Sequence, residues 1–93
     1  MQIVNADQLQ EFSTKHPNAR RALDKWQKIV LQIIWTNFME VRATFRSADY
    51  VKGLVIFNIG GNNYRLVTVI DYARQLVKIR KIMTHREYDR WKP

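Results

Sequence analysis

The segment THREYD, at residues 84–89, holds the side chains best suited to acid–base chemistry in this sequence. Histidine exchanges protons near neutral pH, and tyrosine can do so where nearby cations lower its pKa. If the segment turns helically, His85 and Tyr88 lie three residues apart on one side. Arginine makes planar bidentate contacts with phosphate, so Arg65 adds a phosphate-binding group. Together these residue types suit cleavage of RNA without a metal ion, which needs a base for the ribose 2′-OH, cations at the phosphate and an acid for the leaving 5′ oxygen.

Other chemistries lack the residues they need. The absence of cysteine removes disulfides, thiol nucleophiles and cysteine-ligated metal. The two histidines, His16 and His85, have no acidic or histidine neighbour at metal-ligand spacing. Gly60-Gly61 lacks the lysine and helix of a phosphate loop, and no serine lies in a nucleophile elbow. We therefore expect neither a metal nor a cofactor. His85 could still be an ordinary surface residue.

The positive charge is concentrated in the last third of the chain. Sixteen lysines and arginines against eight acidic residues give a net charge of +8. Residues 65–93 carry eight basic and three acidic side chains, a net +5, whereas residues 1–64 carry eight and five, a net +3. Such a surface can collect a polyanion and release its counterions. The alternative is a basic protein whose charges only face water.

The first half of the chain predicts one strand and two helices. Residues 1–4 read as a short strand, and Asn5 or Asp7 can cap a helix over residues 6–15. Pro17 ends that helix and can begin the next one, because its missing N–H costs nothing in a first turn. Apolar residues then recur at helical spacing to about Trp35. Residues 38–48 are expected to form a helical turn or a loop.

The second half predicts three strands and a short terminal helix or turn. Residues 50–59, 64–70 and 76–83 are rich in β-branched and aromatic side chains. Gly60-Gly61-Asn62 is a hairpin turn between the first two runs, since glycine and asparagine tolerate positive φ. The order β-α-α-β-β-β predicts an α+β fold, with two N-terminal helices packed on one face of an antiparallel sheet.

The chain length predicts a single domain, and the lack of a signal-peptide pattern predicts a location inside the cell. A chain of 93 residues suits a single domain, residues 1–93. The N-terminus has no basic and apolar segments of a signal peptide, and the apolar run at residues 29–35 is too short to cross a membrane. We therefore expect a cytoplasmic protein with no membrane partner.

Strand alternation predicts a basic floor on the sheet. Arg65 shares a face with Val67 and Val69. In the last strand, simple alternation puts one set of residues on one face and a second set on the other: Lys78, Arg80 and Ile82 against Val77, Ile79 and Lys81. If the helices cover one face, part of this group must lie on the other face or at the strand ends. The expected RNA-binding residues are Lys78, Arg80, Lys81, Arg86 and Lys52. The alternative is that they are ordinary solvated side chains.

Two motifs resemble those of HigB-type toxins. The run VIFNIGGNNYRLV at residues 55–67, followed by IDY at 70–72, is similar to one family pattern, and THREYD is similar to its TH-EYD signature. KHP at residues 15–17 and SAD at 47–49 also match. Met83 departs from the family, because many relatives have glycine before Thr-His, and a bulky residue there can tilt His85.

The resemblance implies a RelE-like fold and a metal-free endoribonuclease of a type II toxin–antitoxin system. Such toxins cut messenger RNA on the ribosome and are held silent by a HigA-type antitoxin. By this likeness Arg65 clamps the scissile phosphate, His85 is the acid–base residue, and Tyr88 orients the substrate or transfers a second proton. The alternative is a non-catalytic RNA- or ribosome-binding module or a degenerate toxin, which would not depend on His85.

Overall fold

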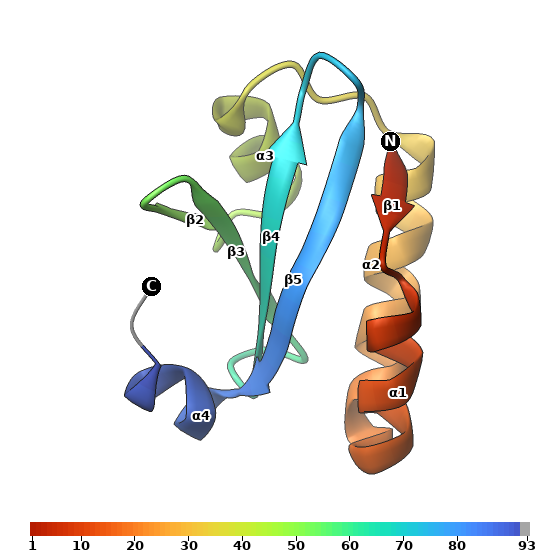
Figure 1. Cartoon of the computed structure of the whole chain (residues 1–93), viewed down its shortest axis with the longest axis vertical. Helices are drawn as coiled ribbons and strands as arrows, with labels where there is room; N and C mark the ends of the chain where they lie inside the picture. Colours follow the sequence, from red (N-terminus) through yellow and green to blue (C-terminus); the bar gives the residue numbers. More distant parts are fainter. Residues whose placement is uncertain (92–93) are drawn as a thin grey trace.

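A five-stranded sheet organises the fold (Figure 1). The computed structural model describes residues 1–91. Along the sheet the strands follow the order β1-β5-β4-β3-β2. Their bounds are β1 (Gln2–Val4), β2 (Asp49–Val51), β3 (Leu54–Ile59), β4 (Tyr64–Asp71) and β5 (Leu76–Thr84). The pairs from β2 to β5 are antiparallel, as predicted, whereas the edge strand β1 pairs in parallel with β5.

Two N-terminal helices cover one face of the sheet, which confirms the predicted α+β class. These two are α1 (Asp7–Lys15) and α2 (Arg20–Gln32). Two shorter helices follow later in the chain, α3 (Phe38–Thr44) and α4 (His85–Arg90). Figure 1 shows α1 and α2 side by side along the sheet, with α4 leaving the end of β5 on the other side. A short 3-10 turn, Pro17–Ala19, joins α1 to α2, so Pro17 begins the second helical segment as expected.

The main core lies between α2, α3 and the sheet. Phe57 of β3 is at its centre, with ring centroids 5.3 Å from Trp26, 6.2 Å from Trp35 and 5.3 Å from Phe45. All but Phe45, which is half-buried, are at most 2% exposed. Aromatic pairs at these distances stabilise a fold beyond the area they bury. This cluster fixes the helical layer against β3.

The run at residues 50–59 was wrongly predicted as one strand. It forms two, β2 and β3, which pair as a hairpin around Lys52 and Gly53. Both turn residues have positive φ, 50° and 84°. Gly53 adopts this conformation readily, but Lys52 does so only because the hairpin imposes it. The structure therefore has one strand more than predicted.

The helix boundaries also differ from the prediction. Neither Asn5 nor Asp7 caps α1: Ala6 is at the cap position without a side-chain hydrogen bond, and Asn5 turns the chain with φ 66°. α2 ends at Gln32, because Ile33 is already extended. The segment predicted as a turn or loop contains the seven-residue helix α3, where the Asn37 side chain accepts a hydrogen bond from the Glu40 backbone.

A small second cluster lies on the face of the sheet away from α1 and α2, which we call the open face. Ile56, Val67 and Met83 are buried there, and Tyr88 and Trp91 pack against them. The helix α4 therefore covers one end of this face. Within residues 1–91 no helix is long and apolar enough to span a bilayer.

Candidate active site

Arg65 lies on the open face as the second residue of the central strand β4, next to the turn from β3. In β4 its neighbours Tyr64 and Leu66 join the main core under the helices, so Arg65 points to the other side. It pairs with Asn58 of β3 and with Met83 of β5. Arg65 is 8% exposed, which is low for an arginine.

The Arg65 guanidinium is held by its own hairpin. Nη1 donates to the carbonyl oxygens of Asn62 and Tyr64, each at 3.1 Å, and Nη2 donates to Asn62 Oδ1. A guanidinium has five N–H donors, so at least two have no partner within residues 1–91. No carboxylate in that range pairs with Arg65. A buried, fixed cation with spare donors is suited to bind an anion such as phosphate.

Tyr88 of α4 lies against Arg65. The guanidinium carbon is 5.7 Å from the centre of the Tyr88 ring, within range for a cation–π interaction. The ring also packs against Trp91, with centroids 6.1 Å apart. The structure thus brings two of the three predicted catalytic residues together.

Arg65 and Tyr88 line a polar cavity of about 630 Å³, which we call the Arg65 cleft. The cleft also reaches α3, the segment after it, and the hairpin of β2 and β3. Its other lining residues are Phe38, Arg42, Arg46, Ser47, Ala48, Asp49, Tyr50, Ile56 and Asn58.

The sequence prediction included none of these additional residues in the site. The tripeptide at residues 47–49 matches a family pattern in the sequence, and in the structure it also lines the cleft. Arg42 is in α3, whereas Arg46 lies two residues beyond its end, after the extended Phe45. No helical spacing therefore links the two arginines, and only the tertiary structure shows that both line the cleft with Arg65.

His85 does not line the cleft. It is the first residue of α4, and its Nε2 atom is 3.3 Å from Asp89 Oδ2 on the next turn. Its Nδ1 atom is buried and has no hydrogen-bond partner within residues 1–91. The side chain is 44% exposed, so its other faces remain open to solvent. The catalytic role of His85 stays a prediction.

None of the five predicted RNA-binding cations lines the cleft. Lys78 pairs with Val69 and Lys81 with Val67, both on the open face. A β-bulge leaves Arg80 exposed and without a partner in β4. Arg86 is exposed on α4, and Lys52 is exposed in the turn of β2 and β3. Their contact with RNA remains a prediction.

Glu87 fixes the start of the helix that carries Tyr88. Its side chain accepts a hydrogen bond from the Thr84 backbone at 2.9 Å, and the Thr84 hydroxyl accepts one from the Glu87 backbone at 3.2 Å. This reciprocal pair is a capping box. The backbone hydrogen bond from Thr84 is the main cause that lowers the pKa of Glu87, and the charges of His16 and Lys81 add to it.

The lowered pKa of Glu87 predicts a pH-dependent stability. A carboxyl whose folded pKa lies below its ordinary value stabilises the fold above that value, 4.5, and loses this effect as pH falls through the folded pKa. The variant Glu87→Gln should therefore melt below the wild type at neutral pH and approach it in acid. Melting curves of both proteins between about pH 7 and pH 3 measure this. A melting difference that does not change with pH would contradict it.

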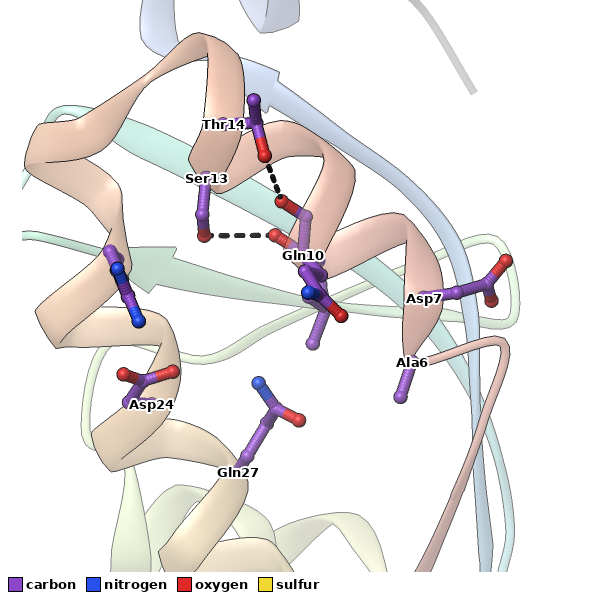
Figure 2. A pocket seen from close by; sticks show the side chains of 9 residues that line it. Ala6, Asp7, Gln10, Ser13, Thr14, Asp24 and Gln27 are labelled. Atoms are coloured by element: carbon purple, nitrogen blue, oxygen red, sulfur yellow. Dashed lines mark hydrogen bonds between the residues drawn. The ribbon is translucent and has the colours of Figure 1, made fainter.

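A second cavity lies between α1 and α2, and none of the three predicted catalytic residues lines it (Figure 2). It has a volume of about 580 Å³. The Ser13 and Thr14 hydroxyls donate to carbonyl oxygens of their own helix, at 2.9 and 3.1 Å. No group of three or more histidine or acidic side chains within residues 1–91 could hold a metal ion, here or elsewhere.

Comparison with known proteins identifies the family of this chain. The family model of the HigB toxins, described as the RelE-like toxic component of a toxin–antitoxin system, matches residues 19–91. The mRNA interferase toxin HigB of Escherichia coli K12 is 29% identical over 92 residues, which cover 96% of this chain and 88% of that protein. The mRNA interferase HigB of Shigella flexneri has the same values, and that of Escherichia coli O6:H1 is 26% identical over 93 residues, 97% and 90% of the two chains.

The matched region contains α2, α3, the hairpins of β2 to β5 and α4, and so every residue that lines the Arg65 cleft. The chain belongs to the HigB toxins, the RelE-like toxic components of toxin–antitoxin systems.

Proposed function

We propose that this toxin cleaves messenger RNA at the Arg65 cleft, without a metal ion. The observation that carries the proposal is the fixed Arg65 guanidinium, which has spare donors and no carboxylate partner within residues 1–91. The similar proteins named mRNA interferases support the reaction class.

The reaction we infer is transfer of the phosphate to the ribose 2′ oxygen. The 2′-OH gives its proton to a base and attacks the adjacent phosphorus, the bond to the 5′ oxygen of the next nucleotide breaks, and an acid protonates that leaving oxygen. The products are a 2′,3′-cyclic phosphate and a 5′-OH. Arg65 stabilises the charge that develops on the phosphate oxygens, where a fixed donor is most effective. Tyr88 orients the substrate or transfers a proton.

His85 is the proposed acid–base residue. It lies three residues before Tyr88 on α4, and Asp89 is 3.3 Å from its Nε2 atom, close enough to orient the ring. RNA that leaves the cleft along α4 would pass His85. Because His85 does not line the cleft, the second candidate function is inhibition by binding RNA or the ribosome without cleavage.

We further propose the setting of this reaction. The toxin acts in the cytoplasm on messenger RNA held by the ribosome, and a HigA-type antitoxin keeps it silent. An acidic or apolar segment of the antitoxin that covered the open face would neutralise its cations and exclude RNA. The net charge of +8 supports binding of a polyanion and of an acidic partner.

Loss of the His85 imidazole should lower cleavage by about a hundredfold, the lower range for a general acid or base. Cells would express the wild type, His85→Ala or Arg21→Gln without antitoxin, and new 5′ ends of messenger RNA would be mapped by primer extension. Arg21 is exposed on α2 and serves as a control for expression. New 5′ ends that persist at wild-type frequency in His85→Ala would contradict its role. Growth arrest without new ends would favour the binding function.

Cleavage should be insensitive to removal of metal ions. EDTA is added in excess over trace transition-metal ions to a purified translation reaction, and magnesium is kept in larger excess so that the ribosomes stay assembled. If the chain's own side chains stabilise the phosphate, the cleavage rate should not change. Loss of cleavage that added magnesium or zinc restores, with ribosomes intact, would sink the metal-free mechanism.

A further inference from the structure

The wall of the Arg65 cleft formed by α3 and the segment after it carries two cations besides Arg65. Arg42 is in the last turn of α3, and Arg46 follows four residues later. Both side chains are exposed and both line the cleft. No carboxylate within residues 1–91 pairs with either arginine. Two neighbouring guanidinium groups repel each other, and a bound anion removes that repulsion.

The cleft has little negative charge to balance these arginines. Among residues 1–91, the only acidic side chain that lines it is Asp49, against Arg42, Arg46 and Arg65. Asp49 Oδ1 accepts a hydrogen bond from the Tyr50 backbone at 2.9 Å, which fixes this carboxylate without removing its charge. The described lining residues carry a net charge of +2, from three arginines and one aspartate, and therefore favour an anionic ligand.

An aromatic pair lies beside the two arginines. Phe38 of α3 and Tyr50 of β2 have ring centroids 5.6 Å apart, and both line the cleft. Tyr50 is 56% exposed, which is unusual for so large a ring that has an apolar neighbour. Exposed aromatic rings next to a cationic groove are the feature by which proteins bind single-stranded nucleic acid.

We propose that Arg42, Arg46 and Tyr50 form a nucleotide-binding subsite next to the scissile phosphate. The two arginines hold the phosphate of a neighbouring nucleotide, and Tyr50 stacks its base. The cavity of about 630 Å³ is continuous from Arg65 to these residues, and sites of ~300–1,000 Å³ typically hold a small ligand. The inference deepens the proposed function and rests on it for the position of the scissile phosphate.

The subsite selects single-stranded RNA. A base can stack on Tyr50 only if it leaves its own stack, which a duplex does not permit without unpairing. The aromatic face accepts any base, so this contact gives affinity and register rather than a sequence preference. Arg42 and Arg46 are binding residues in this scheme, and Arg65 remains the group at the reacting phosphate.

The test measures binding to a short single-stranded RNA that carries 2′-O-methyl groups and cannot be cleaved. Affinity is determined by fluorescence anisotropy at several salt concentrations, for the wild type and for Arg42→Gln/Arg46→Gln. Loss of the one phosphate contact made by these two arginines should make the plot of log K against log salt shallower by about 0.7 and weaken binding about fourfold near 0.15 M salt.

The matched control is Arg20→Gln/Arg21→Gln, which removes the same charge from exposed positions at the start of α2. It should retain the wild-type salt slope. Tyr50→Ala should weaken RNA binding without changing the salt slope. Tyr50→Phe should bind RNA as tightly as the wild type, because stacking needs only the aromatic ring. Equal losses in both double variants would mean a general charge effect and overturn the subsite.

Two further outcomes separate this inference from its alternatives. Normal RNA affinity together with lost antitoxin affinity in Arg42→Gln/Arg46→Gln would assign the wall to the antitoxin and overturn the proposal. Cleavage of unmodified RNA is assayed separately. If the wild type fails to cleave RNA but the double variant still shows the shallower salt dependence of binding, the proposed function is wrong and the subsite stands.

Discussion

Replacement of Arg65 by alanine should reduce kcat for RNA cleavage by about 10² to 10³, the usual cost of removing one fixed donor from a developing oxyanion. The reason is the hairpin that holds the guanidinium, because a donor already in position needs no reorganisation during the reaction. Single-turnover cleavage of a ribosome-bound message, with Arg65→Ala and the wild type at saturating toxin, measures this directly.

Arg65→Lys is the matched control for charge. Lysine keeps the positive charge but has no planar fork, so its rate should fall between those of alanine and arginine. Folding is checked by the melting temperature, since the hydrogen bonds lost with Arg65→Ala are worth about 1 kcal/mol each. A folded Arg65→Ala protein with the wild-type rate would remove Arg65 from the mechanism.

Truncation of Phe57 to alanine should destabilise the fold by about 3–5 kcal/mol. Three aromatic rings lose a partner, and the site is too closely packed to collapse around the smaller side chain. A small domain has only about 5–15 kcal/mol in total, so this one change removes a large part of its stability.

Urea denaturation gives the free energy of unfolding for Phe57→Ala and for the control Met39→Ala. Met39 is 81% exposed, so its truncation should change stability by less than about 0.5 kcal/mol. Equal effects of the two substitutions would show that Phe57 is not the centre of the core.

The fold was predicted correctly where local sequence signals marked a turn or a helix end. It was predicted wrongly where an element carries no clear local signal of its own. The turn at Gly60 and Gly61 has positive φ at both residues, 63° and 69°, which their lack of a side chain favours. The turn at Lys52 gave no comparable signal, so β2 and β3 were read as one strand. The seven residues of α3 are too few for a clear helical period, and the Asn37 cap was not recognised.

The candidate site was predictable only in part. The position of Arg65 on the face away from the helices follows from strand alternation, and the structure confirms it. Its contact with Tyr88 required the helix after β5, which the sequence also indicated. Arg42 and Arg46 come from a segment without a strong period, and nothing local says that it packs beside Arg65.

Strand alternation alone also misplaced part of β5. Prediction by simple alternation put Lys78 and Ile82 on one face and Lys81 on the other. In the structure Lys78 and Lys81 share the open face, and Ile82 packs into the main core. The bulge at Arg80 causes the change, because one unpaired residue reverses the parity of every residue after it.

That reversal sets the direction in which the chain leaves the sheet. β5 runs into α4 without a loop, since Thr84 both ends the strand and caps the helix. In a fully regular strand Met83 would point toward α1 and α2, and the helix would begin from that side. The inserted residue acts as a half-turn in the backbone, so the last helix of the chain and the phosphate-binding arginine meet on the same surface.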